Sequence, residues 1–295
     1  MPLHDPSLDA LVEEQRRVVA ALPPGPPPPA PPGTLLPASE EPLPDRADVS
    51  LRVLDPGRAR GVLLHFHAGG LTMGVPAMAD ASNSLLARAC GIAVVSVGYR
   101  LAPQHPHPAA VEDGEAAALW LLEQAPARFG TERVLIGGDS AGAWLAAHTL
   151  LRLRLRQRHA AARRVRAAYF AVGCFDLSMT PSQRASTPAM FLSPERLKGS
   201  RSAAFPGLDG ELLRDPSISP LYADLADLPP AIFSVGTDDA MLDDTLFMAA
   251  RWQVAGNVGE LQVYPEGTHL FMNLPTRMAA EAWRRVAAFF DRHLG

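Results

Sequence analysis

From residue 47 to the C-terminus, short apolar runs alternate with stretches of helical length, and this alternation restricts the fold more than any other feature. The apolar runs cover residues 49–54, 61–67, 92–99, 133–138, 167–173, 231–237 and 260–265. The helical stretches cover residues 79–90, 109–125, 141–157, 240–255 and 276–292. Such alternation predicts an α/β fold, in which a mostly parallel sheet carries helices on both faces.

Two segments stand outside this alternation. Residues 7–22 have apolar side chains at helical spacing and precede a proline-rich stretch, so we predict a helix and an extended connector within residues 1–46. Residues 177–220 are rich in serine and proline and lack an obvious strand, which predicts an insertion over one end of the sheet. Residues 47–176 and 221–295 then form a single α/β core.

Composition and charge exclude several classes of protein. The net charge of −4 argues against general binding of nucleic acid, and no run of about 18 apolar residues is present to span a membrane. The chain does not start with a basic segment followed by an apolar one, so we predict a cytoplasmic location. Cys90 and Cys174 stand in apolar runs and are predicted to be buried free thiols. The seven arginines of residues 151–166 are interpreted as a solvated helix end rather than a patch for nucleic acid or membrane.

The most specific motif for chemistry is the G-x-S-x-G pattern Gly138-Asp139-Ser140-Ala141-Gly142, which lies between an apolar run and a helical stretch. In this context a sharp turn from strand to helix lifts the serine hydroxyl clear of the sheet. Glycines two positions away let neighbouring backbone pass close to the turn. The helix that follows presents free N–H groups to developing negative charge. Ser140 is therefore the predicted nucleophile.

A serine nucleophile needs a general base, and that base needs an orienting carboxylate. On such a scaffold the chain order is serine, acid, histidine. Among the histidines after Ser140, His148 and His159 lie in the helix and basic segment behind the nucleophile, and His293 ends the last helix. His269 remains, just past a predicted strand, where a loop can carry an imidazole over the edge of the sheet.

Four aspartates follow the apolar run 231–237 and are candidates for the acid. Asp239 stands far enough past the run to reach His269, and Asp243 lies about one helical turn further on. Asp238 and Asp244 are interpreted as helix-start residues, which the helix dipole favours.

A metal centre is a competing interpretation of the histidines. His65 and His67 share one side of a predicted strand, a spacing that suits zinc. His105 and His107 belong to a separate loop, and no acidic or cysteine partner is spaced near them. We therefore expect no metal ion and no cofactor.

Five stretches, in this order, resemble the hormone-sensitive-lipase-like esterases, bacterial family IV of the α/β-hydrolase superfamily. They are "HFHAGG", "SVGYRLAPQHPHPAAVEDG", "GGDSAGAWLA", "SPLYADLADLPPAIFSVGTDDAMLDD" and "VYPEGTHLF". The resemblance implies the α/β-hydrolase fold, with Ser140 as nucleophile and His269 as base and later acid. It implies Asp239 as the orienting acid, because the family's G-x-x-D falls on Gly236–Asp239.

The resemblance also implies an oxyanion hole made by the backbone N–H groups of Gly69, Gly70 and Ala141. Glycine is expected in the loop because a side chain would block the approach of the substrate carbonyl, and His67 is expected to hold this loop by hydrogen bonding. For Asp243, a recurrent second aspartate of the family, a structural role is favoured. The resemblance further implies that the first helix and the insertion cover the pocket as a cap. Because members of the family often form dimers, it also implies a homodimer.

The chain departs from the family pattern at several positions. Ala68 replaces the first glycine of H-G-G-G, Gln104 replaces a usual glutamate, and Ala143 and Trp144 replace the usual Gly-Asn after the serine motif. Leu270 follows His269 where glycine is common, and would narrow the space beside the base. The side chains expected to line the substrate pocket are Trp144, Met190, Phe191, Phe205 and Leu270.

These features predict a serine carboxylic-ester hydrolase that acts on short- to medium-chain acyl esters through an acyl-enzyme. A deacetylase or lactonase for a specific natural product is the alternative within hydrolysis. A ligand-binding protein on an esterase scaffold is the alternative outside it, as in the plant gibberellin receptors, which lack the catalytic histidine. His269 is present here and favours an enzyme with a small-molecule ester as its substrate.

Overall fold

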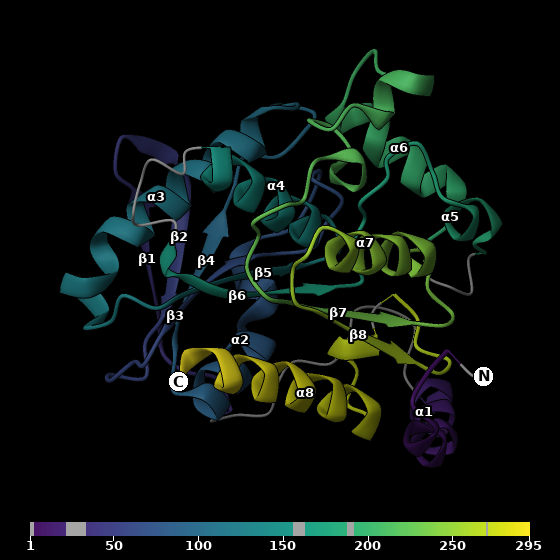
Figure 1. The fold of residues 1–295 in the computed structure, drawn as a ribbon, viewed down its shortest axis with the longest axis horizontal. Coiled ribbons are helices and arrows are strands. Elements are labelled where there is room, and N and C mark those ends of the chain that lie inside the picture. Colours follow the sequence, from purple (N-terminus) through teal and green to yellow (C-terminus); the bar gives the residue numbers. More distant parts are fainter. Residues whose placement is uncertain (1–2, 22–33, 156–162, 188–191, 270) are drawn as a thin grey trace.

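The computed structural model describes residues 3–21, 34–155, 163–187, 192–269 and 271–295, arranged as in Figure 1. Eight strands form one sheet in the order β1-β2-β4-β3-β5-β6-β7-β8. They are β1 (Ala38–Leu43), β2 (Arg46–Leu54), β3 (Val62–Phe66), β4 (Ala93–Gly98), β5 (Val134–Asp139), β6 (Val165–Ala171), β7 (Ala231–Gly236) and β8 (Gly259–Tyr264). Strands β3 to β8 are parallel, whereas β2 runs antiparallel to both of its neighbours. The predicted mostly parallel sheet is confirmed.

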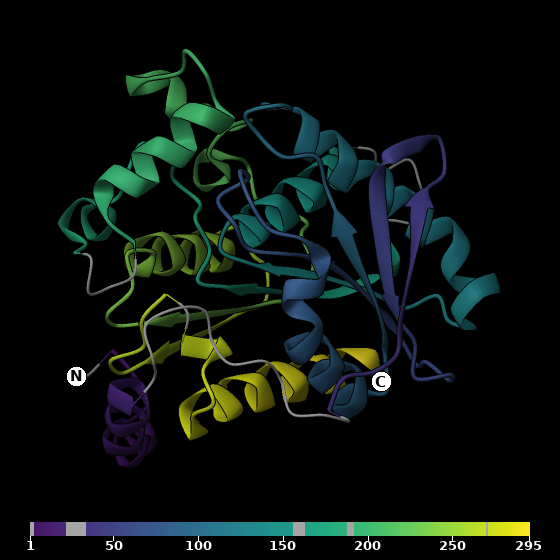
Figure 2. The same ribbon diagram turned by 180° about the vertical axis from the view of Figure 1, so that it is seen from behind.

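Helices cover both faces of this sheet. They are α1 (Asp9–Ala21), α2 (Asp80–Cys90), α3 (Ala109–Phe129), α4 (Ala141–Leu155), α5 (Pro181–Ala185), α6 (Pro194–Ala204), α7 (Leu242–Val254) and α8 (Arg277–Leu294). Helices α3, α4 and α7 lie on one face, and α2 and α8 lie on the other (Figures 1 and 2). In β3, Leu64 and Phe66 pack beneath the first group and Leu63 packs beneath the second. Burial on both faces explains why the central strands read as continuous apolar runs.

Strand β1 is the element that the sequence pattern misses. It lies inside residues 38–46, where we expected a connector, and it pairs with β2 at the edge of the sheet. Its residues are mostly exposed and include Glu40, Glu41 and Pro42. Charged residues and proline on an edge strand discourage pairing with other chains, and they also remove the apolar signal of a strand.

The insertion and the first helix lie over opposite faces of the sheet, at the end where β7 and β8 point (Figures 1 and 2). The described part of residues 177–220 contains α5 and α6, and Ala204 and Phe205 at the end of α6 join the core beneath α3 and α4. Before α1, Leu8 joins the core beneath α8. No helix among the described residues is long and apolar enough to cross a membrane. Cys90 is buried, Cys174 is partly buried, and both are free thiols.

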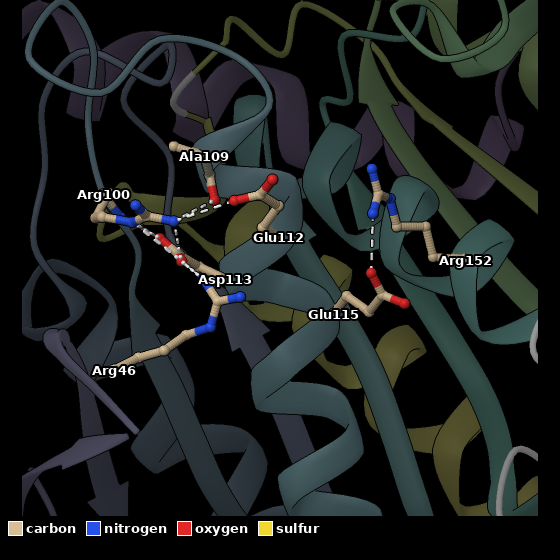
Figure 3. Close-up of polar contacts among 7 residues, drawn as sticks. All are labelled: Arg46, Arg100, Ala109, Glu112, Asp113, Glu115 and Arg152. Carbon is tan, nitrogen blue, oxygen red and sulfur yellow. Dashed lines mark hydrogen bonds and ion pairs between the residues drawn. The ribbon is translucent and has the colours of Figure 1, made fainter. Parts of the chain in front are cut away.

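A buried ion-pair cluster joins α3 to the start of β2 and to the loop after β4 (Figure 3). The Asp113 carboxylate is fully buried and accepts hydrogen bonds from Arg100 Nη2 at 2.8 Å and Arg46 Nη1 at 3.0 Å. The backbone N–H of Arg100 donates to the same carboxylate at 3.0 Å. Separately, Arg152 on α4 donates to Glu115 on α3 at 2.9 Å. These contacts lock α3 against the sheet edge and against α4.

Removal of the Asp113 carboxylate should destabilise the fold strongly. Asp113→Ala leaves Arg46 and Arg100 without their shared buried partner, a change that costs about 3–5 kcal/mol when both charges are buried. Because the two arginine side chains are 36% and 22% exposed, we expect a loss near the lower end, about 3 kcal/mol. Urea denaturation measures this loss. Glu112→Ala is the matched control, since this partner of Arg100 has a side chain that is 44% exposed and should contribute about 1 kcal/mol or less. Equal losses for the two variants would contradict the assignment.

Candidate active site

The serine of the G-x-S-x-G motif lies in a sharp turn between β5 and α4. Ser140 has a φ of 56°, in the left-handed region that residues with side chains rarely adopt. Its backbone N–H donates to the carbonyl of Ala171 at 2.8 Å. A Cβ on Gly138 would lie 2.5 Å from the Gly142 backbone, and one on Gly142 would lie 2.0 Å from the Phe66 carbonyl oxygen. Both glycines are required because backbone passes within contact distance on each side of the turn.

Three residues that are far apart in sequence form a continuous hydrogen-bonded chain at this turn. His269 Nε2 lies 2.9 Å from Ser140 Oγ, and His269 Nδ1 lies 2.9 Å from Asp239 Oδ1. Asp239 is fully buried, and its Oδ1 also accepts a hydrogen bond from the backbone N–H of Met241 at 2.9 Å. With Nδ1 donating to the carboxylate, Nε2 is free to accept the serine proton.

The loops that carry Asp239 and His269 are bound to each other. A Cβ on Gly236 would lie 1.9 Å from the Gly267 carbonyl oxygen. The end of β7 and the loop that carries His269 are therefore in direct backbone contact, with no side chain between them. That carbonyl accepts from Asp238 N at 3.0 Å, and Glu266 N donates to Thr237 Oγ1 at 2.8 Å. On the other side, the amide of Gln15 in α1 donates to the Glu266 carbonyl at 2.9 Å. The first helix therefore contacts the loop just before His269.

The loop after β3 contains the glycines predicted for the oxyanion hole. Gly69 has φ of 137° and Gly70 has φ of 61°, which favour glycine at both positions. A Cβ on Gly69 would lie 1.9 Å from the carbonyl oxygen of Met73. The loop's own backbone therefore excludes a side chain at Gly69, a different reason from the expected clearance for a substrate carbonyl. At Gly70 a Cβ would instead meet the hydroxyl of Ser200 on α6, at 3.1 Å.

The two histidines of β3 and its following loop have internal partners. His67 Nδ1 donates to the Ala68 carbonyl at 2.7 Å, and its ring stacks on Tyr99 with centroids 4.3 Å apart. The Tyr99 hydroxyl donates to the His67 carbonyl at 2.8 Å, so this pair holds the glycine loop. His65 lies between Ser96 Oγ at 2.8 Å and Asp139 Oδ2 at 3.2 Å. No group of three or more His, Cys, Asp or Glu placed to hold a metal occurs among the described residues.

The remaining aspartates near β7 have different environments. Asp238 is exposed, and Asp243 accepts from the backbone N–H of Ser182 at 2.8 Å, which binds α7 to α5. Asp244 lies in the first turn of α7, as expected, but it is fully buried. Its carboxylate accepts four hydrogen bonds of 2.7 to 2.8 Å, from Phe175 N, Asp176 N, Thr180 Oγ1 and Gln183 Nε2. No local pattern signals this role, because every donor lies more than 60 residues earlier in the chain.

Two of the predicted pocket residues pack against each other. Trp144, in the first turns of α4, and Phe205, at the end of α6, meet edge to face with ring centroids 5.7 Å apart. The indole N–H of Trp144 donates to the Ile218 carbonyl at 2.7 Å. His107 packs against the Phe205 ring at 5.1 Å. The other predicted pocket residues, Met190, Phe191 and Leu270, lie outside the described residues, as does His159.

Two buried histidines should make the fold sensitive to acid. Burial lowers the pKa of His67 to about 4 and the pKa of His148 to about 3, from 6.5. Between pH 6.5 and 4 the unfolded chain then binds protons that the folded chain does not, so the free energy of unfolding falls as pH falls. His148→Gln removes one such group and should reduce the slope by about 1.4 kcal/mol per pH unit within this window. Urea denaturation from pH 7 to 4 tests this, with the exposed His105→Gln as control; an unchanged slope in His148→Gln would refute it.

Comparisons with known proteins agree with this architecture. Residues 63–273 match the model of a family described as having the alpha/beta hydrolase fold. A carboxylic ester hydrolase, LipN of Mycobacterium tuberculosis, is 33% identical over 74% of this chain and 59% of its own length. The carboxylesterase NlhH of the same species is 31% identical over 84% of this chain and 79% of its own. The chain thus spans under two thirds of the first relative and about four fifths of the second.

Solved structures extend the comparison to almost the whole chain. The Pyrobaculum calidifontis esterase superimposes with a TM-score of 0.80 at 26% identity, covering 97% of this chain and 92% of its own. A hormone-sensitive lipase from a metagenome library superimposes with a TM-score of 0.76 at 25% identity, covering 100% of this chain and 94% of its own. The chain therefore belongs to the α/β-hydrolase fold family, among the hormone-sensitive-lipase-like esterases.

Proposed function

We propose that this chain is a serine carboxylic-ester hydrolase with Ser140 as nucleophile, His269 as general base and Asp239 as orienting acid. The observation that carries the proposal is the unbroken hydrogen-bonded chain from Ser140 Oγ through both nitrogens of His269 to Asp239 Oδ1, with 2.9 Å at each contact. A base with a buried carboxylate behind it and a serine hydroxyl in front can activate that hydroxyl near neutral pH.

The reaction proceeds in two halves. Ser140 Oγ forms a bond to the ester carbonyl carbon while its proton passes to His269 Nε2, and Asp239 stabilises the imidazolium that results. His269 then gives this proton to the leaving alcohol as the bond from carbonyl carbon to alkoxy oxygen breaks, which leaves an acyl-enzyme. In the second half, water attacks the acyl carbon, His269 takes its proton, and the carboxylic acid departs as Ser140 is regenerated.

The oxyanion that forms in each half needs hydrogen-bond donors. We assign this role to the backbone N–H groups of Gly69, Gly70 and Ala141. Ala141 is the first residue of α4, so its N–H belongs to the unpaired donors at the positive end of a helix. The unusual φ values of Gly69 and Gly70 support a loop shaped for such donors.

For the substrate we propose esters with short- to medium-chain acyl groups. Trp144, whose backbone N–H donates to the Ser140 carbonyl at 3.2 Å, packs its large buried ring against Phe205, which supports limited room for the acyl chain. Relatives carry the names acetyl-hydrolase in Streptomyces hygroscopicus and ethyl acetate hydrolase in Pseudomonas putida, and these names point to small acyl groups. A homodimer and a cytoplasmic location stay predictions from the sequence.

A panel of p-nitrophenyl esters from acetate to palmitate, together with simple lactones, tests the proposal. We expect the highest kcat/KM at acetate or butyrate and a steep decline beyond medium chain length. A maximum of kcat/KM at palmitate would contradict the proposed acyl preference. Efficient turnover of lactones alone would favour the hypothesis that the enzyme is a lactonase. The same panel on Ser140→Ala separates enzymatic turnover from background hydrolysis.

A further inference from the structure

One face of α6 bridges the loops that surround the proposed active site. Ser200 on this face lies against Gly70, because a Cβ on that glycine would be 3.1 Å from Ser200 Oγ. One turn earlier, Leu197 packs against Ala240 and Met241, which directly follow Asp239. Arg201 stands four residues after Leu197 and therefore projects from the same face of the helix.

Arg201 differs from the other half-buried arginines of the described chain in having no ion-pair partner. Each of the others pairs with an Asp or Glu; they are Arg46, Arg52, Arg100, Arg152, Arg154, Arg164 and Arg285. Every Asp and Glu of the sequence lies within the described residues, so the partner is not supplied from elsewhere in this chain. A partly desolvated guanidinium without a counter-ion is less stable than a paired one, and a bound anion would supply the missing negative charge.

Most hydrogen-bonding capacity of this guanidinium is unused. Arg201 Nη1 donates to the Leu177 carbonyl at 3.1 Å. Its Nε is buried without a partner, and Nη2 makes no hydrogen bond within the described part of the chain. An arginine side chain has five N–H donors in a planar fork that matches a carboxylate.

The helix that carries Arg201 packs against the residues that follow the acid of the proposed triad. Cys174 follows β6, which lies between β5 with its serine turn and β7 with its acid loop. Cys174 packs against the same Ala240–Met241 cluster as Leu197 of α6. Burial raises the pKa of the Cys174 thiol most strongly, the carboxylates of Asp244, Asp176 and Asp239 raise it further, and Arg201 lowers it. Since Asp239 is already paired with His269, it does not serve as the counter-ion of Arg201.

We propose that Arg201 binds a carboxylate carried by the ester substrate, so that the enzyme favours esters with a second, ionised acid group. This inference rests on the proposed function, because it names a substrate class for the same site. Two isomeric placements of the carboxylate are distinguished by experiment: on the acyl group, as in a half-ester of a dicarboxylic acid, or on the alcohol.

The test compares kcat/KM for matched ester pairs in wild type and Arg201→Gln. The acyl pair is p-nitrophenyl hydrogen glutarate with p-nitrophenyl pentanoate, and the alcohol pair is 3-acetoxybenzoate with phenyl acetate. In one of the two pairs, the carboxylate is on the part of the ester that Arg201 binds. For that pair, kcat/KM on the anionic ester relative to kcat/KM on the neutral ester should fall by about tenfold or more in Arg201→Gln, as expected for loss of a charge-assisted hydrogen bond. In Arg201→Gln the loss on the anionic ester should appear mainly as a higher KM, with a smaller change in kcat. Lys198→Gln, an exposed cation on the same helix, is the control and should leave the ratio unchanged.

Three outcomes would overturn the proposal. The first is an unchanged ratio for both pairs in a folded Arg201→Gln. The second is an equal fall in kcat/KM on anionic and neutral esters, which would mean that Arg201 only holds the Leu177 carbonyl in place. The third needs no variant: wild type that prefers the neutral ester by more than about tenfold in both pairs has no productive carboxylate site. Failure of the proposed function is a separate result, because neither member of either pair would then be hydrolysed.

Discussion

Ser140→Ala should abolish ester turnover while leaving the protein folded. The serine hydroxyl is the only atom of this residue in the hydrogen-bonded chain with His269, so the substitution removes the nucleophile and little else. Loss of the nucleophile in a serine hydrolase lowers kcat by about 10⁶-fold. The measurement is the steady-state rate on the best ester of the acyl panel, together with the thermal midpoint of unfolding.

The matched control is Ser217→Ala, an exposed serine whose hydroxyl donates to Asp215 and not to a triad residue, which should retain wild-type turnover. A sulfonyl fluoride that reacts with activated serines should label wild type at Ser140, as seen by mass spectrometry, and should not label Ser140→Ala. Turnover by Ser140→Ala within about tenfold of wild type would remove the assignment of the nucleophile.

Asp239→Ala should lower kcat by about 10⁴-fold, the scale found when the triad acid alone is removed. The carboxylate holds His269 with Nδ1 as donor, and it is fully buried, so neither water nor another described acid replaces it at the imidazole. KM should change much less, because Asp239 stabilises a charge that exists only during the reaction. The exposed neighbour Asp238→Ala is the control and should retain turnover.

Asp239→Asn separates the geometry of the site from its charge. Asp239 Oδ1 accepts from both His269 Nδ1 and Met241 N, so an amide of the same shape can keep the geometry, but it has no negative charge and its N–H₂ group favours the other imidazole tautomer. We therefore expect Asp239→Asn to lower kcat by about 10⁴-fold, close to the loss in Asp239→Ala. If Asp239→Ala kept kcat within tenfold of wild type, Asp239 would not be the orienting acid.

The order of elements in the core could be predicted because each central strand is buried on both faces. Strands such as β3 and β7 are continuous apolar runs, and the helices between them carry an apolar side. Strand β1 could not be predicted in this way, because an exposed edge strand with Glu40, Glu41 and Pro42 has no apolar period. Its place depends on pairing with β2 rather than on its own side chains.

The sequence by itself determined the serine turn, since Gly138 and Gly142 flank Ser140 within five residues and the strain of the turn is local. It left Asp239 and Asp243 as alternatives on spacing alone, until the family resemblance favoured Asp239. Only the tertiary structure placed Asp239 against His269 and Asp243 against Ser182.

Only the tertiary structure also decided the hydrogen bonds of the buried Asp244 carboxylate and the lack of an ion-pair partner for Arg201. The donors to Asp244 come from residues 175–183, and the isolation of Arg201 becomes visible only when every carboxylate has a position in space. Hydrogen bonds and ion pairs act over a few ångströms, whereas these partners are tens of residues apart along the chain. Spacing in sequence can therefore predict candidate site residues, but the tertiary fold decides which of them come into contact.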